Sequence, residues 1–138
     1  MPKVFKTIID VNNYIESACE KAIEIVAERM TQELESYIRE DFYRQYSPRF
    51  YKRTYQLLKS TQYNMINSNT AEIFIDMDSM RYLTDSAEDV VKLASLGYHG
   101  TIDIFRPGMF WEDFIDWCNK NISTLMKQAL KSQGITVN

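Results

Sequence analysis

The 138-residue sequence contains only four glycines, three prolines, two cysteines and one histidine. The cysteines, Cys19 and Cys118, have neither CxxC nor CxxH spacing, so a zinc site of the usual kind is not expected. Both fall within predicted helices, which favours buried free thiols in a reducing compartment over a disulfide. His99 has only Asp103 nearby as a partner for catalysis or metal binding, and we expect it to have a structural or surface role.

Long apolar runs and a strong excess of basic charge are also missing. Residues 1–9 carry two lysines without the apolar segment of a signal peptide, and no later run is long enough to span a bilayer. The net charge of −3 argues against non-specific binding to DNA, which needs a strongly basic field. The ordinary apolar and charged fractions predict one folded domain spanning residues 1–138.

A long segment without glycine or proline dominates the first third of the chain. Its periodicity predicts one helix over about residues 10–45, with Asp10 as the N-cap and a length of roughly 50 Å. Two pairs of opposite charge at i,i+4 spacing support this helix: Glu35 with Arg39, and Glu40 with Arg44.

The apolar side chains of this helix change face halfway along it. The first half has one apolar stripe, made of Val11, Ile15, Ala18, Cys19, Ala22 and Val26. The second half has a strict i+4 row, the apolar row, made of Met30, Leu34, Ile38 and Phe42. Because an i+4 row advances about 40° per step, the two faces point in different directions. Either the halves contact different parts of their own domain, or one face meets another protein.

On the other side of the helix runs an i+4 row of carboxylates, the acidic ridge, made of Glu16, Glu20, Glu24 and Glu28. Like charges at this spacing repel by a few tenths of a kcal/mol per pair. The ridge is therefore either a solvated face or a surface that meets basic groups on a neighbouring subunit.

Pro48 ends the helix and opens a corner over residues 46–60, because the residue before a proline is pushed out of the helical region. The corner interleaves aromatic with basic side chains: Tyr46, Phe50, Tyr51 and Tyr55 with Arg49, Lys52, Arg53 and Lys59. Such a pattern can stack nucleic-acid bases, but the acidic ridge beside it would repel phosphate. Leu57 and Leu58 are expected to provide at least one anchor to the core.

Residues beyond the corner alternate with the period of β-strands. They predict a hairpin over about residues 61–77 with one solvated face, turning at Asn67–Thr70. Ser86–Asp89 is typical of a capping box, which predicts a short helix over about residues 86–96 that ends at Gly97. Residues 101–105 are expected to form a short edge strand.

A second strong helix is predicted over about residues 109–133, before Gly134. The aromatic-rich start of this helix is expected to cover the apolar face of the hairpin. Its apolar stripe comprises Trp111, Phe114, Ile115, Cys118, Ile122, Leu125, Met126 and Ala129. Core packing is the default expectation for Trp111 and Trp117, although Trp117 falls outside this stripe and exposure stays open for it. The fold expected from these elements is α+β, with a long N-terminal helix and a C-terminal amphipathic helix packed on a small, mainly antiparallel β-sheet.

The order of these elements resembles a bacteriophage family. The motif Arg53-Thr54-x-x-Leu57-x-x-Ser60, leading from a proline-containing aromatic corner into a hairpin, is similar to small head–tail connector or tail-completion proteins of long-tailed phages. These proteins are often described as minor capsid or tail components. Gly100-Thr101 after the hairpin, followed by a closing amphipathic helix, fits the same layout.

The resemblance implies a structural virion protein of the phage neck, placed between the portal-side connector and the tail. It implies a homo-oligomeric ring, often of six copies, with portal, adaptor and tail-tube proteins as partners. Because exposed ion pairs are weak, the isolated protein could stay monomeric at low concentration and assemble only on the particle. Its location would be the virion and, during assembly, the host cytoplasm. A tail terminator, another minor tail or capsid protein, a nucleic-acid-binding module and a cellular adaptor remain alternatives.

An enzyme would need an acid, base or nucleophile set, and the sequence offers only isolated carboxylates such as Asp76 and Asp78. We therefore expect no enzymatic activity, catalytic residue, cofactor or metal. The candidate residues are those of a contact between subunits. Glu20 and Glu24 of the acidic ridge are expected to meet Arg49, Lys52 and Arg53 of the next subunit's corner. The apolar row would supply most of the affinity, because exposed ion pairs contribute only about 0–1 kcal/mol each.

Overall fold

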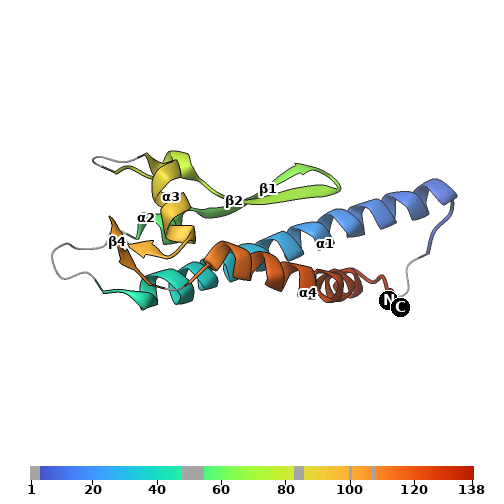
Figure 1. Ribbon diagram of the computed structural model, residues 1–138. Coiled ribbons are helices and arrows are strands. Elements are labelled where there is room, and N and C mark those ends of the chain that lie inside the picture. Colours follow the sequence, from blue (N-terminus) through green and yellow to red (C-terminus); the bar gives the residue numbers. More distant parts are fainter. Residues whose placement is uncertain (1–3, 48–54, 83–85, 100, 107) are drawn as a thin grey trace.

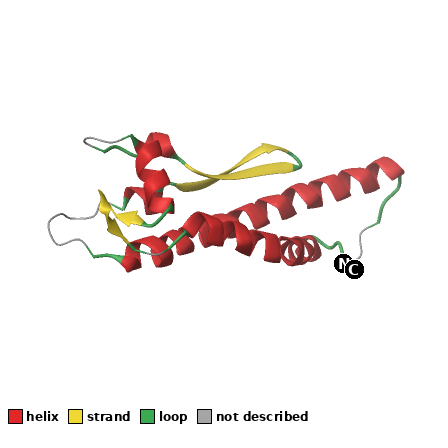
Figure 2. Ribbon diagram, in the orientation of Figure 1, coloured by secondary structure: helices red, strands yellow, loops and turns green. Residues whose placement is uncertain are grey.

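The computed structural model describes residues 4–47, 55–82, 86–99, 101–106 and 108–138, without the side chains of residues 101–104. The fold is α+β, as the sequence predicts (Figure 2). In chain order its elements are α1 (Ile8–Tyr37), the π-helical turn η1 (Ile38–Phe42), the 3-10 turn η2 (Tyr43–Gln45), α2 (Gln56–Lys59), β1 (Thr61–Asn67), β2 (Thr70–Ile75), the 3-10 turn η3 (Met77–Ser79), α3 (Ala87–Ser95), β3 (Tyr98–His99), β4 (Thr101–Phe105) and α4 (Phe110–Ser132).

Helix α1 begins two residues before the expected start and ends at Tyr37, so the last part of the helix predicted to about residue 45 is instead the turns η1 and η2. Thr7 is extended and its hydroxyl accepts a hydrogen bond from the Asp10 backbone N–H at 3.1 Å, so Thr7 is the N-cap and the prediction of Asp10 was wrong. Asp10 instead lies in the first turn, where its negative charge interacts favourably with the helix dipole. The two predicted i,i+4 pairs are confirmed: Glu35 with Arg39 at 2.7 Å, and Glu40 with Arg44 at 2.8 Å.

The hairpin and α4 lie on opposite sides of α1 (Figure 1). Helix α1 contacts α4 on one side and both β1 and β2 on the other. The expectation that the start of α4 covers the hairpin was therefore wrong, because α4 packs on α1 instead. The buried alanines of α1 are small enough to let neighbouring elements approach closely: Ala18, Ala22 and Ala27. The change of apolar face along α1 is thus accounted for within the domain.

The strands form two separate antiparallel pairs, β1 with β2 and β3 with β4. In the first pair the register runs from Thr61 opposite Ile75 to Asn67 opposite Thr70, with an irregularity after Met65. The Asn67 side chain accepts a hydrogen bond from the Asn69 backbone N–H at 3.0 Å, which closes the predicted turn.

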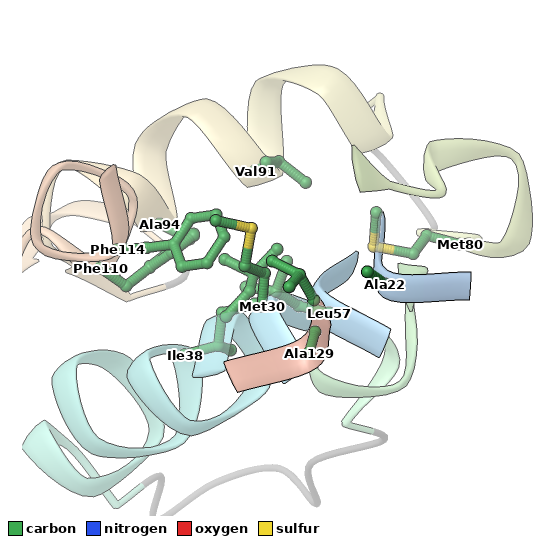
Figure 3. Packing of buried hydrophobic residues seen from close by; sticks show 12 residues of the cluster. Ala22, Met30, Ile38, Leu57, Met80, Val91, Ala94, Phe110, Phe114 and Ala129 are labelled. Atoms are coloured by element: carbon green, nitrogen blue, oxygen red, sulfur yellow. The ribbon is translucent and has the colours of Figure 1, made fainter. Parts of the chain in front are cut away.

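One apolar cluster holds α1, η1, α2, α3 and α4 together (Figure 3). Its buried members are Ala22, Val26, Met30, Leu34, Ile38, Leu57, Met80, Val91, Ala94, Phe110, Phe114 and Ala129. Leu57 is 2% exposed and Leu58 packs half-buried against the cluster, so the expected core anchor of the corner is confirmed.

The core-facing side of α4 is narrower than its apolar stripe. Phe110 and Phe114 are buried, whereas Trp111, Ile115 and Ile122 are 37–46% exposed. Trp117, which falls outside the predicted stripe, packs against the core. The Arg29 guanidinium lies 5.6 Å from the centre of the Trp117 ring and joins α1 to α4.

The N-cap of α3 and the glycines that follow α3 and α4 were predicted correctly. The Ser86 hydroxyl accepts a hydrogen bond from the Asp89 backbone N–H at 3.2 Å and caps α3. Gly97 and Gly134, with φ of 98° and 88°, follow the ends of α3 and α4. Cys19 and Cys118 are half-buried free thiols, and burial raises the pKa of Cys118 to about 11.

Candidate interaction surfaces

The apolar row faces the domain's own core. Met30, Leu34 and Ile38 are 6%, 0% and 0% exposed. Phe42 is half-buried, and its ring stacks on His99 with centroids 4.3 Å apart and planes 5° from parallel. The expectation that this row supplies affinity between subunits is corrected here, because core side chains already cover it.

The acidic ridge is solvent-exposed along its whole length on α1. Within the described part of the chain, none of its four carboxylates forms an ion pair. The Tyr63 hydroxyl on β1 donates a long hydrogen bond of 3.5 Å to Glu24, which places the ridge alongside the hairpin. Partial desolvation and the Glu24 and Glu28 carboxylates raise the pKa of Tyr63. Glu20 and Glu24 are therefore accessible to a partner.

Arg49, Lys52 and Arg53 lie outside the described residues, so their contact with the acidic ridge stays a prediction. The described ends of the corner are packed through aromatic rings. Tyr55 has a left-handed φ of 57°, a conformation that costs roughly 1–2 kcal/mol, and its ring lies 5.0 Å from that of Tyr43. The ring contact offsets part of that strain.

His99 lies in an aromatic cluster at the same end of the molecule. It is 2% exposed, and besides its stack on Phe42 its ring lies 5.2 Å from that of Tyr46. The Arg106 guanidinium lies 5.7 Å from the centre of the Tyr46 ring. These contacts connect the turns that follow α1 to β3. In them His99 acts as a packing residue among aromatic rings.

Exposed apolar side chains gather in two places that the sequence analysis did not single out. Val4, Ile8 and Ile9, at the start of α1, are 87%, 80% and 70% exposed. Along α4, Trp111, Ile115 and Ile122 form a partly exposed row beside the core. The adjacent isoleucines before Asp10 were the available signal for the first place. The exposed row on α4 had no such signal in the sequence, because its residues belong to the same apolar stripe as the core side chains.

Two carboxyl groups meet where the end of α1 reaches the start of α4. Asp41 lies on the π-helical turn, and Asp113 lies in the first turn of α4. Burial and a hydrogen bond with the Asp113 carboxyl, followed by the charges of Asp113 and Glu40, raise the pKa of Asp41 to about 7. Two ionised carboxylates have no donor, so this contact needs one protonated partner. Asp41 Oδ2 is buried and has no hydrogen-bond partner among the described residues, so an ionised carboxylate there is poorly solvated.

The raised pKa of Asp41 predicts that this contact stabilises the fold at acidic pH. Because its folded-state value of about 7 exceeds the ordinary 3.8, the stabilisation is complete below pH 4 and is lost as the pH rises through 7. With solvent screening we expect a fall of about 1 kcal/mol in the free energy of unfolding between pH 5 and 8. Urea denaturation should show this slope in the wild type and a flatter one in Asp41→Asn. Equal slopes would contradict the assignment.

A family model named YomN matches residues 7–133, which include every element from α1 to the end of α4. The chain belongs to the YomN family. YomN itself is a Bacillus phage-region protein. Comparison with curated proteins and with solved structures gave no match.

The YomN match runs through the whole helix–hairpin–helix arrangement, so the family unit includes both the acidic ridge and α4. Among the helices that the structure describes, none has both the length and the hydropathy needed to cross a membrane. The described residues also contain no group of three or more histidine, cysteine, aspartate or glutamate side chains arranged to hold a metal ion.

Proposed function

We propose that this chain is a structural component of a tailed-phage particle. Membership of the YomN family carries the proposal, because YomN is a Bacillus phage-region protein and this suggests a phage origin. Within the particle, the resemblance of the corner motif to head–tail connector and tail-completion proteins favours a place in the neck. There the chain would form a homo-oligomeric ring, of six copies in the arrangement typical of such proteins, between the portal-side connector and the tail.

The architecture supports an adaptor role through its surfaces. Among the described strands, β1 and β2 pair only with each other, so each leaves an outer edge that can accept a strand from a neighbour. The exposed isoleucines at the start of α1 and the exposed row on α4 add apolar area outside the core. A protein with this role requires no catalytic residue, cofactor or metal, and the proposal assigns none.

Removing the gene from the phage that encodes this chain should leave filled heads and complete tails that fail to join. Supplying the wild-type protein should restore joined, infectious particles, and cryo-electron microscopy should place its density between portal and tail tube. Normal infectivity without the protein would overturn the structural role. Density at the tail tip or on the capsid would keep the virion role and replace the neck position with that of another minor component.

A further inference from the structure

We infer that the acidic ridge of one subunit docks on a basic row of α4 in the next, made of Lys120, Lys127 and Lys131. The inference rests on the self-assembly proposed above, and it assigns the ridge to α4 in place of the corner expected from the sequence. Its partner is a second copy of this chain.

The three lysines lie on one side of α4. Their spacings of seven and four residues keep them within about 40° of one another around a helix that turns about 100° per residue. All three are exposed, and none forms an ion pair within the described part of the chain. The row spans roughly 17 Å and the acidic ridge roughly 18 Å, at about 1.5 Å per residue. The two rows are similar in length and opposite in charge, and the central Glu20 and Glu24, about 40° apart around α1, are the ridge residues that can face the lysine row together.

The two rows are arranged for contact between molecules rather than within one. Tyr14 donates a hydrogen bond to the Gln133 backbone oxygen at 2.6 Å, while Gly108 packs on the Asp41 backbone, so α1 and α4 run antiparallel. The acidic ridge nevertheless borders β1, and α4 lies on the opposite side of α1 from the hairpin (Figure 1). A contact between different surfaces of identical subunits is heterologous, and it gives a ring when its rotation closes.

Charge along α4 also sets the register of this contact. Its first two turns carry Glu112, Asp113 and Asp116, whereas the basic row follows further along. The acidic ridge is repelled by the first part of α4 and attracted by the second. Ile25, beside the ridge, is 43% exposed and can pack against the aliphatic part of a lysine side chain.

Exposed ion pairs are weak and are screened by salt. The contact should therefore be detectable at high protein concentration and low ionic strength, and it would become strong only where a preformed phage surface gathers several copies. Sedimentation velocity of the wild-type chain should show a mass that rises with concentration in low salt and returns to the monomer value in about 0.5 M salt.

Charge reversal tests the pairing directly. We expect Glu20→Lys with Glu24→Lys, or Lys120→Glu with Lys127→Glu, to weaken self-association on the order of tenfold or more. An equimolar mixture of these two variants should associate again, as should one chain carrying all four changes. Glu88→Lys and Lys92→Glu, both exposed on α3 and outside either row, serve as controls that should associate like the wild type. Circular dichroism verifies that each variant is folded.

Three results would overturn the inference: a wild-type chain that stays monomeric at every concentration in low salt, reversed variants that associate like the wild type, or a fourfold variant that does not recover. None of these results would contradict the proposed position of the protein in the phage neck. Conversely, charge-dependent association of a protein absent from the neck would reject that position and leave the pairing intact.

Discussion

Replacing Phe110 with alanine is expected to lower the free energy of unfolding by about 3–5 kcal/mol. Phe110 begins α4, is 0% exposed, and belongs to the cluster that includes Leu34 and Ile38 from the α1 side. Its removal costs both the transfer free energy of the ring and the cavity left between two helices that cannot fully close around it. Equilibrium urea denaturation of the two proteins, compared at equal slopes, measures the difference.

Trp111 provides the matched control, since it is the next residue on the same helix and also carries a large aromatic ring. It is 37% exposed and lies outside the buried cluster, so Trp111→Ala should cost markedly less than Phe110→Ala. Equal losses for the two variants, or a larger loss for Trp111→Ala, would contradict the packing described for α4.

Features set by neighbours in the sequence were predicted well. The continuous helix of α1, the turn at Asn67, the Ser86 cap and the glycine after α3 each depend on a few adjacent residues whose chemistry is visible in the sequence. The N-cap of α1 was predicted wrongly because Thr7 and Asp10, three positions apart, are both good capping residues. Only the extended backbone of Thr7 distinguishes them.

Features set by distant residues were predicted poorly. An apolar stripe shows that a helix packs, but its partner depends on the whole fold, so α4 was assigned to the hairpin although it packs on α1. The exposure of Trp111 was missed for the same reason, because a helical wheel does not reveal where a core ends. The carboxyl pair of Asp41 and Asp113 joins residues far apart in the chain, and no local pattern announces it.

The predicted subunit interface was affected most, because it too depends on which distant residues cover each helix face. The acidic ridge was correctly expected to be accessible, since four glutamates in a row are costly to bury. The apolar row carried no comparable constraint, because apolar side chains fit equally well into a core or an interface. Its burial in the structure moves the search for subunit contacts to α4, where the lysine row and the exposed apolar residues remain accessible.

Substituting aspartate for Leu34 is expected to prevent stable folding of the chain. Leu34 is 0% exposed, so a carboxylate there would be buried in an apolar cluster without a partner among the described residues. A buried unpaired charge costs several kcal/mol, which is comparable with the total stability of a typical domain. Circular dichroism should show loss of the cooperative thermal transition that the wild-type chain displays.

Ile25→Asp makes the same chemical change on the same helix at a site that is 43% exposed, and this variant should keep a cooperative transition close to that of the wild type. Failure of Leu34→Asp to enter phage particles would therefore report lost folding rather than a lost subunit contact. If Leu34→Asp instead melts like the wild type yet fails to assemble, the burial of the apolar row is wrong and the row belongs to the interface after all.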